Sequence, residues 1–420
     1  MWFDGRVRTQ ARPLALAAGA LGLWAIAKYW SLVTQVWRPN EYSDAYYYFL
    51  QCQKAASGGG LAGLLPEYPT PAAALLYLPY ALGGVDHDAY RWIFLVGVVA
   101  VDAAFVAVLL ARGWAGAVVA WTVLETLSGR LALLRFDVLP AVLGALAVAS
   151  LLRRRDAEAS AFVVAGAAVK AWPAILAPLT LGDRRTRVRA LVTSAIAAAV
   201  VAGASMAAAG WDRLLSPLFY QRDRGLQIEA VAATTGMLAR LDGTGPQVVW
   251  TTWNAYELAG PGVQQSLANA NLAAGLALVA FVGLGIRWLT QGSRPDAAAH
   301  LALFATSAFM VTSKALSPQY LLWLAAPVVV VLAHSLTDRR RISADGVRAV
   351  VSFVLVGVLV TLTAYLYPLH YDDLLAGARR PTEVLAVRNV GLLVFMVWSG
   401  TAAWVAARSD RGSRGPAATG

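Results

Sequence analysis

The sequence has 420 residues, of which 58% are hydrophobic and only 14% are charged, and its formal net charge is +11. Ordinary soluble domains are roughly 45–50% apolar and about 25% charged, so this composition excludes a water-soluble fold. The basic residues lie between apolar blocks rather than along one face, so the charge indicates membrane topology and no nucleic-acid partner. A single cysteine, Cys52, excludes an intramolecular disulfide.

The chain begins with a predicted membrane anchor. Leu14–Val33 is apolar and follows three arginines. A secretory signal has a shorter apolar core and a small-residue cleavage site, for which Ala25–Ala27 is a weak candidate, so an uncleaved first helix is favoured. Later apolar blocks of spanning length include Trp92–Leu110, Leu191–Ala209 and Val350–Tyr367, because about 20 residues cross a hydrocarbon layer of about 30 Å.

Arginine-rich loops predict how the chain crosses the membrane, because short loops rich in Lys and Arg stay cytoplasmic. Two such clusters, at 153–155 and 184–189, flank one apolar stretch, Ala159–Leu181. Both clusters stay inside only if this stretch forms two half-spans that turn at Lys170–Pro173. Proline favours such a turn, since it disfavours helix at the preceding residue and suits the first turn of a new helix. The same reasoning predicts turns within 128–140 and 314–319.

The sequence therefore predicts an all-α polytopic membrane protein with about 12 transmembrane helices, some of them broken or half-spanning. Residues 1–408 are expected to form one transmembrane domain, and 409–420 a flexible cytoplasmic tail. Both termini are expected in the cytoplasm, and the half-span turns on the outer side of the plasma membrane. Two outer loops, at about 34–90 and 210–266, share that side. They include short apolar segments such as Pro71–Gly84 that suit interfacial helices.

The polar residues of these loops and turns are the candidate functional residues. Asp44 follows the first helix amid tyrosines, where an acid suits a general base; the alternative is a solvated loop acid beside interfacial tyrosines. Lys170 and Lys314 stand at predicted helix breaks, where a lysine suits a phosphate; the alternative is snorkelling to the interface. Further candidates on this side are Glu67, Tyr68, Arg135, Asp137 and Gln319.

A charged segment at 220–229 contains Arg222, Arg224 and Gln227. Guanidinium groups offer paired donors that suit a phosphate; the alternative is an interfacial helix whose charges pair with one another. Four scattered histidines and a lone cysteine give no metal-ligand spacing, and no glycine-rich nucleotide fingerprint follows a strand signal. The sequence thus predicts no metal, nucleotide or other cofactor.

Several short segments, in their order along the chain, resemble the membrane-embedded glycosyltransferases of the GT-C fold. They are most similar to the family-87 mannosyltransferases of actinobacteria, which use polyprenyl-phosphate-mannose. The segments are Ser43-Asp44, Glu67–Pro69, Arg135–Pro140, Val169–Pro173, Asp223–Glu229 and Ser317–Trp323. One departure is the proline pair that usually follows the first-loop tyrosine, which is Pro69-Thr70-Pro71 here.

The resemblance implies an inverting glycosyltransferase that moves a hexose, by family mannose, from a polyprenyl-phosphate donor to a cell-envelope glycolipid or lipoglycan within the bilayer. Asp44 would be the catalytic base, and Lys170, Arg224 and Gln227 would lie near the donor phosphate. Such a donor brings its own leaving group, so neither nucleotide nor metal is required. The alternative is a transporter or flippase of lipid-linked sugars without catalysis, whose site would lie near the bilayer midplane between internal repeats.

Overall fold

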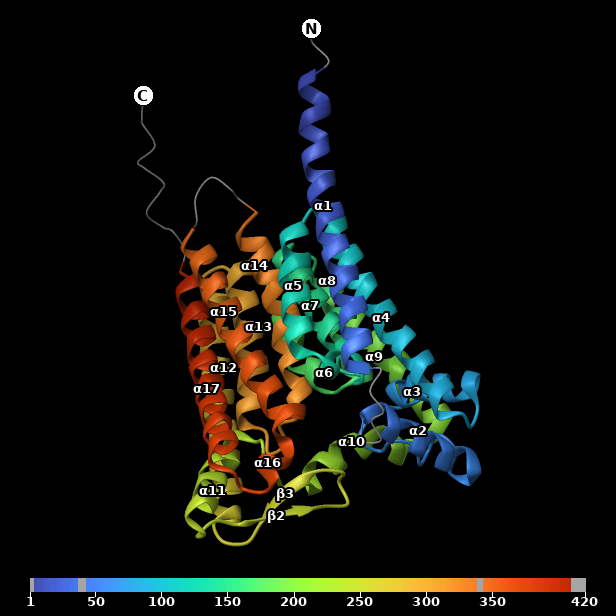
Figure 1. The fold of residues 1–420 in the computed structure, drawn as a ribbon. Helices are drawn as coiled ribbons and strands as arrows, with labels where there is room; N and C mark the ends of the chain where they lie inside the picture. Colours follow the sequence, from blue (N-terminus) through green and yellow to red (C-terminus); the bar gives the residue numbers. More distant parts are fainter. Residues whose placement is uncertain (1–3, 37–42, 338–342, 409–420) are drawn as a thin grey trace.

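The computed structural model describes residues 4–36, 43–337 and 343–408, without the side chains of residues 4–13. The expected tail at 409–420 and part of the first outer loop lie outside the described residues. The helices run side by side as a bundle, and short helices and strands cover one end of it, called the loop-rich end below (Figure 1). The start of α1 (Asp4–Ser31) and the end of α17 (Arg379–Ala406) both point toward the opposite end, beyond which the first turns of α1 project (Figure 1).

Seven helical segments of the described residues are long and apolar enough to cross a membrane, so the chain is a multi-pass membrane protein. Four of them are single helices, namely α4 (His87–Ala111), α9 (Arg187–Ala209), α12 (Val263–Thr290) and α17. Two combine a helix with a π-helical turn: Leu14–Val36 is most of α1 with Leu32–Val36, and Ala344–Leu369 is α15 (Ala344–Ala364) with Tyr365–Leu369. The last, Pro318–Ser335, combines a 3-10 turn (Pro318–Leu321) with α14 (Leu322–Ser335). The expected total of about 12 spans remains a prediction.

Other helices in the bundle are shorter. They are α5 (Ala115–Ser128), α6 (Arg130–Leu133), α7 (Val138–Leu152), α8 (Asp156–Val169), a 3-10 helix (Trp172–Leu181) and α13 (Pro295–Thr312). At about 1.5 Å per residue, α7 with 15 residues and α8 with 14 are each just over 20 Å long, which is less than a hydrocarbon core of about 30 Å. Neither helix alone is therefore long enough to cross that core.

The chain reverses direction at Lys170, where the arginine pattern predicts a turn. α8 ends at Val169, the backbone of Lys170 is extended (φ −157°, ψ 127°), and Pro173 lies in the first turn of the following 3-10 helix. Gly144 of α7 allows this helix to pack closely, because a Cβ atom there would lie 2.8 Å from the ring of Trp172. The turn thereby places Lys170 between the end of α8 and the start of the 3-10 helix.

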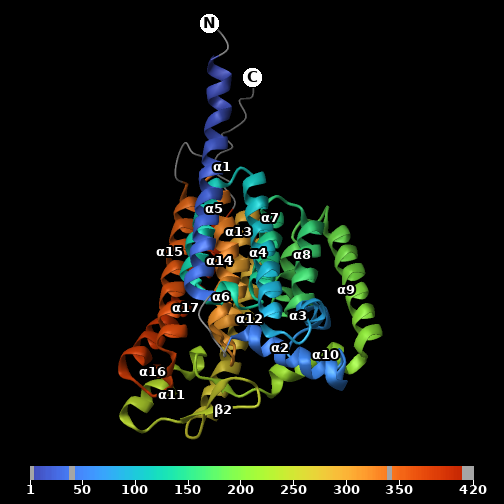
Figure 2. The same ribbon diagram turned by 45° about the vertical axis from the view of Figure 1, so that its right-hand side comes forward.

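The loop-rich end combines short helices with a small sheet that the sequence did not predict. Its elements are α2 (Asp44–Lys54), a π-helical turn (Ala55–Gly59), α3 (Thr70–Gly83), α10 (Trp211–Asp223), β1 (Leu226–Gln227), 3-10 turns (Val231–Ala233 and Arg240–Asp242), α11 (Thr234–Ala239), β2 (Gln247–Trp250), β3 (Tyr256–Ala259) and α16 (Tyr371–Leu375). The strands are antiparallel in the order β1-β3-β2. In both views α2, α3 and α10 lie on one side of this end, and α11 and α16 lie under α17 (Figures 1 and 2).

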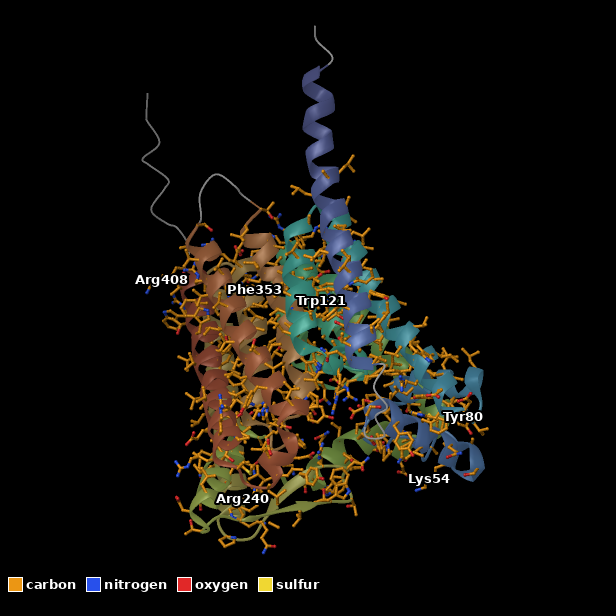
Figure 3. The ribbon with its side chains drawn as sticks, in the orientation of Figure 1. Lys54, Tyr80, Trp121, Arg240, Phe353 and Arg408 are labelled. Atoms are coloured by element: carbon orange, nitrogen blue, oxygen red, sulfur yellow. The ribbon has the colours of Figure 1, made fainter. Side chains whose placement is uncertain are left out.

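Three charged side chains meet inside the bundle and are called the intramembrane ion cluster below. Nζ of Lys28 on α1 lies 2.8 Å from Oδ2 of Asp102 on α4, and it also bonds the carboxylate of Glu125 on α5. The indoles of Trp24 and Trp121 donate to Asp102 at 2.7 and 2.5 Å. Figure 3 shows Trp121 within the helices, between the end marked by Arg408 and the end marked by Arg240. The cluster ties α1 to the bundle, because charges in hydrocarbon are costly unless paired.

Candidate active site

Asp44 begins α2, and Ser43 caps this helix by accepting a hydrogen bond from the amide of Tyr46 at 3.2 Å. Oδ2 of Asp44 lies 2.8 Å from Nη1 of Arg135, which stands in the turn between α6 and α7. The same Nη1 donates to Oε1 of Gln319 at 2.7 Å, in the 3-10 turn before α14. The structure thus brings three of the predicted residues together from three separate turns.

Lys170 also has an acidic partner. Its Nζ lies 2.7 Å from Oδ1 of Asp137, and the indole of Trp323 donates to the same oxygen at 2.9 Å. The sequence suggested a phosphate as the missing anion, because no acid is near Lys170 in the chain; the structure corrects this reasoning, since α7 brings Asp137 alongside. The rings of Tyr68, Tyr320 and Trp323 surround Nζ at 5.3, 5.1 and 5.2 Å from their centroids. Lys170 is therefore enclosed by protein rather than extended to the interface.

The residues Asp44, Arg135, Asp137, Lys170 and Gln319 are called the Asp44 cluster. Its two acids and two bases balance each other in charge. Burial raises the pKa of Asp44, Arg135 and Lys170 oppose that rise, and Asp137 reinforces it, so the pKa lies above its ordinary value. A carboxyl with a raised pKa accepts a proton more readily than an exposed one. Oδ2 of Asp137 is buried and has no hydrogen-bond partner within the described part of the chain.

Glu67 and Tyr68 face the tyrosines of α2. The hydroxyls of Tyr68 and Tyr48 lie 2.9 Å apart, and the hydroxyl of Tyr47 donates to Oε1 of Glu67 at 2.9 Å. Burial raises the pKa of Glu67, and its second oxygen is buried without a hydrogen-bond partner among the described residues. Tyr68 joins the Asp44 cluster through its contact with Lys170, and Glu67 stands beside it in the chain.

Arg224 and Gln227 belong to a second polar group. Nε of Arg224 lies 3.9 Å from Oε1 of Glu257 on β3, and both side chains are at most 9% exposed. Gly225 packs closely against this carboxylate, because a Cβ atom there would lie 2.5 Å from Oε2 of Glu257 and would displace it. The amide of Gln227 donates to the carbonyl of Lys314 at 2.9 Å, while Oε1 of Gln227 is buried and unpaired among the described residues.

Arg222 and Lys314 are less suited to a ligand than Arg224. Arg222 is exposed and pairs with the adjacent Asp223 at 2.8 Å, as the alternative of self-paired surface charges expects. Nζ of Lys314 donates to the carbonyl of Arg222 at 2.6 Å. Arg224, by contrast, is buried, and its charge is among those that oppose the rise in the pKa of Glu67. Its guanidinium lies 5.9 Å from the centroid of the Tyr220 ring.

Two residues of the site have no role in the sequence-based prediction. Trp323 follows Gln319 by one helical turn, and this spacing is a signal that it faces the same way. Glu257 gives no such signal. Its position depends on the pairing of strands that are only two to four residues long, which no sequence pattern indicates.

Buried acids and bases that gather at one end of membrane-spanning helices are typical of an enzyme that acts in the bilayer. The sequence profile of glycosyltransferase family 87 matches residues 68–318, well over half of the chain. The chain therefore belongs to glycosyltransferase family 87 and is a membrane glycosyltransferase, which confirms the class that the resemblance implied. A search of curated proteins finds no match. The matched region contains Lys170 and Arg224, but Asp44 and Gln319 lie outside it.

Proposed function

We propose that the protein transfers mannose from polyprenyl-phosphate-mannose to a hydroxyl of a cell-envelope glycolipid or lipoglycan. The observation that supports this most directly is the Asp44 cluster, in which a carboxyl with a raised pKa lies 2.8 Å from Arg135 and close to Lys170. The loop-rich end faces the outside of the plasma membrane in this proposal, because the arginine clusters at 153–155 and 184–189 favour the cytoplasm for the opposite end.

In the proposed reaction, Asp44 takes the proton of the acceptor hydroxyl as the acceptor oxygen attacks C1 of the donor sugar. The bond from C1 to the phosphate oxygen breaks, and the lipid phosphate leaves with the electron pair. Lys170 and Arg224 stabilise the negative charge that grows on this phosphate, and Gln227 adds a neutral hydrogen bond. Because the displacement is direct, it inverts C1, and a β-linked donor gives an α-mannoside.

Lys170 enters this reaction already paired with an anion. Asp137 balances its charge before the donor binds, so that the free enzyme does not hold an isolated buried cation. A phosphate would therefore share Lys170 with Asp137. Nε of Arg224 is buried and has no hydrogen-bond partner among the described residues, which leaves it available to a second phosphate oxygen.

A transfer assay tests the proposal. Purified protein in nanodiscs is mixed with radiolabelled polyprenyl-phosphate-mannose and extracted cell-envelope glycolipids, and we expect label in the glycolipid fraction. Asp44→Asn keeps the size of the side chain but accepts no proton, so we expect turnover to fall roughly 10²–10⁴-fold while donor binding remains. Asp242→Asn is the matched control, because Asp242 is an exposed acid at the same end of the bundle.

Two results would contradict the proposal. Near-normal turnover of Asp44→Asn would exclude this carboxyl as the base. Movement of the donor lipid across a vesicle membrane without any product would instead establish a transporter. The family assignment and the position of the polar residues at helix ends both favour the transferase.

A further inference from the structure

Three tyrosine rings form a chain of contacts that reaches Arg135 of the Asp44 cluster through Tyr367. Tyr371 on α16 contacts Tyr367 and Tyr256, with ring centroids 5.1 and 6.0 Å apart, and all three residues are partly exposed. The guanidinium of Arg135 lies 5.0 Å from the centroid of the Tyr367 ring. Arg135 also pairs with Asp44, so the Arg135 side chain connects these rings to the candidate base.

A buried polar group adjoins these rings. Nη2 of Arg388 on α17 donates to the carbonyl of Glu229 at 3.1 Å and lies 3.5 Å from its Oε2 atom. Asn389 donates to Oγ1 of Thr234 at 2.8 Å. The hydroxyl of Tyr371 interacts with the Glu229 carboxylate and favours its ionised form. Glu229, Arg388 and Asn389 are each at most 1% exposed.

Four polar atoms of this group have no hydrogen-bond partner among the described residues. They are Oε1 of Glu229, Nε and Nη1 of Arg388 and Oδ1 of Asn389. Buried polar atoms are nearly always hydrogen-bonded, so a concentration of unpaired ones indicates a polar molecule that completes them. The atoms comprise both donors and acceptors, and the charges of Glu229 and Arg388 cancel. These features suit a neutral ligand with several hydroxyls better than a phosphate.

We propose that Tyr256, Tyr367, Tyr371 and the Glu229–Arg388 pair form a binding subsite for a sugar ring of the acceptor. The apolar faces of the tyrosine rings would pack against the C–H face of the sugar, and the partly exposed Tyr371 hydroxyl would connect the sugar hydroxyls to the buried group. The assignment to the acceptor rests on the proposed function. Lys170 and Arg224 take the donor phosphate there, and the acceptor must reach Asp44 from another side.

Sugar binding can be measured without turnover, which separates this proposal from the transfer reaction. The probe is methyl α-mannoside, titrated against the full-length protein in nanodiscs by saturation-transfer NMR. We expect Tyr371→Ala and Glu229→Gln to weaken its binding at least tenfold, while binding of polyprenyl-phosphate-mannose is unchanged. Tyr77→Ala is the matched control, because Tyr77 is a partly exposed tyrosine of α3 outside this group.

Each other outcome decides against the subsite or against its assignment. Unchanged mannoside binding in both variants overturns the subsite, whatever the transfer assay shows, and indicates that ordered water completes the four atoms. Displacement of the mannoside by polyprenyl-phosphate-mannose overturns the acceptor assignment, because the donor sugar then occupies these rings. If Tyr371→Ala does not fold, Tyr371→Phe keeps the ring and removes only the hydroxyl, and an unchanged affinity with both this variant and Glu229→Gln again overturns the subsite. Mannoside binding that depends on Tyr371, in a protein that transfers no mannose, leaves the subsite standing and removes the proposed reaction.

Discussion

The charge of Lys170 is balanced within the protein itself. It pairs with Asp137, and three aromatic rings take the place of water around its ammonium group. Cation–π contacts stabilise the charge without using its hydrogen-bond donors. An ammonium group has three such donors, so one bond to Asp137 leaves capacity for a phosphate oxygen.

We therefore expect Lys170→Ala to weaken donor binding by roughly tenfold to a hundredfold, since a hydrogen bond to a charged group contributes about 1.5–3 kcal/mol. Lys170→Arg should retain part of the affinity, because it keeps the charge but alters the geometry. Titration with polyprenyl phosphate measures the effect. Lys170→Ala also leaves Asp137 uncompensated, so Lys170→Ala/Asp137→Asn is the control that separates phosphate binding from damage to the fold. Full donor affinity in the double variant would remove Lys170 from the phosphate site.

Because the pKa of Glu229 is raised, we expect the stability of the folded protein to depend on pH. Burial raises its pKa to about 7 from an ordinary value of 4.5, while Arg388 and Arg135 oppose the rise. Its contribution to stability is therefore fully present below pH 4.5 and is lost as the pH rises through about 7, because the unfolded chain gives up this proton more easily. Thermal unfolding in detergent should show a melting temperature that falls between about pH 5 and pH 8.

Glu229→Gln cannot ionise and should lose part of that pH dependence. Asp44 and Glu67 have pKa values raised in the same direction, so some dependence remains in the variant. Equal slopes of melting temperature against pH in the variant and the natural protein would show that Glu229 does not titrate in this range.

The candidate site residues could be selected from the sequence more readily than their partners. Asp44 and Lys170 are polar residues at the ends of apolar segments, and such positions are visible along the chain. The contacts of Asp44 with Arg135 and of Lys170 with Asp137 join separate helices, and no local pattern encodes them. The role of Arg388 is still harder to predict from the sequence, because this residue lies inside an apolar helix and its partner Glu229 is in a loop far away in the chain.

Among the secondary-structure elements, the turn between α8 and Trp172–Leu181 was predictable from the sequence. Lys170 and Pro173 interrupt an apolar stretch there, and arginine clusters flank that stretch on both sides. The sheet was not predictable, since strands of two to four residues are too short to show an alternating pattern. The sequence also did not predict that Trp172–Leu181 is a 3-10 helix. Pro178 lies inside this segment and lacks a backbone N–H, so it removes a helical hydrogen bond, whereas Pro173 lies in the first turn, where no such bond is made.

The turn at Lys170 predicts which positions share a side of the membrane. In a Cys52→Ser background, single cysteines at positions 54 and 170 should be modified only from outside sealed cells by an impermeant maleimide. Cysteines at 154 and 185 should be modified only after permeabilisation. Arg154, Arg185 and Lys54 are exposed, so they label readily, whereas position 170 should label slowly because Lys170 is largely enclosed. Arg340 belongs to the same expected cytoplasmic set but lies outside the described residues.

Equal accessibility of positions 154 and 170 from one side would contradict the half-span arrangement. Labelling of 154 from outside and of 54 from inside would keep the arrangement and reverse its orientation in the membrane.

The intramembrane ion cluster joins three helices of the bundle, and it connects α1, whose spanning segment is only 17% buried, to α4 and α5. Lys28→Met leaves Asp102 and Glu125 as two adjacent acids without a cation. Breaking a buried ion pair in this way typically costs about 3–5 kcal/mol. We expect a clear drop in the melting temperature of Lys28→Met in detergent. Arg379→Met is the matched control, since Arg379 pairs with Glu383 at the exposed start of α17 and should change stability little.

Lys28→Met/Glu125→Gln should recover part of the lost stability, because it removes one of the two uncompensated charges. A melting temperature of Lys28→Met equal to that of the natural protein would show that α1 is held by packing alone.

The paired half-spans α8 and Trp172–Leu181 have a consequence for how the chain enters the membrane during synthesis. At about 1.5 Å per residue in an α-helix and about 2.0 Å in a 3-10 helix, 14 and 10 residues give lengths near 20 Å, and neither segment alone matches a bilayer core of about 30 Å. Neither segment alone is therefore expected to be stable across the bilayer as it is made. We expect the two segments to enter the membrane together, as a hairpin with Lys170 at the tip. Asp137 precedes both segments in the chain and is therefore synthesised first. Lys170 can pair with Asp137 as soon as the hairpin folds against α7.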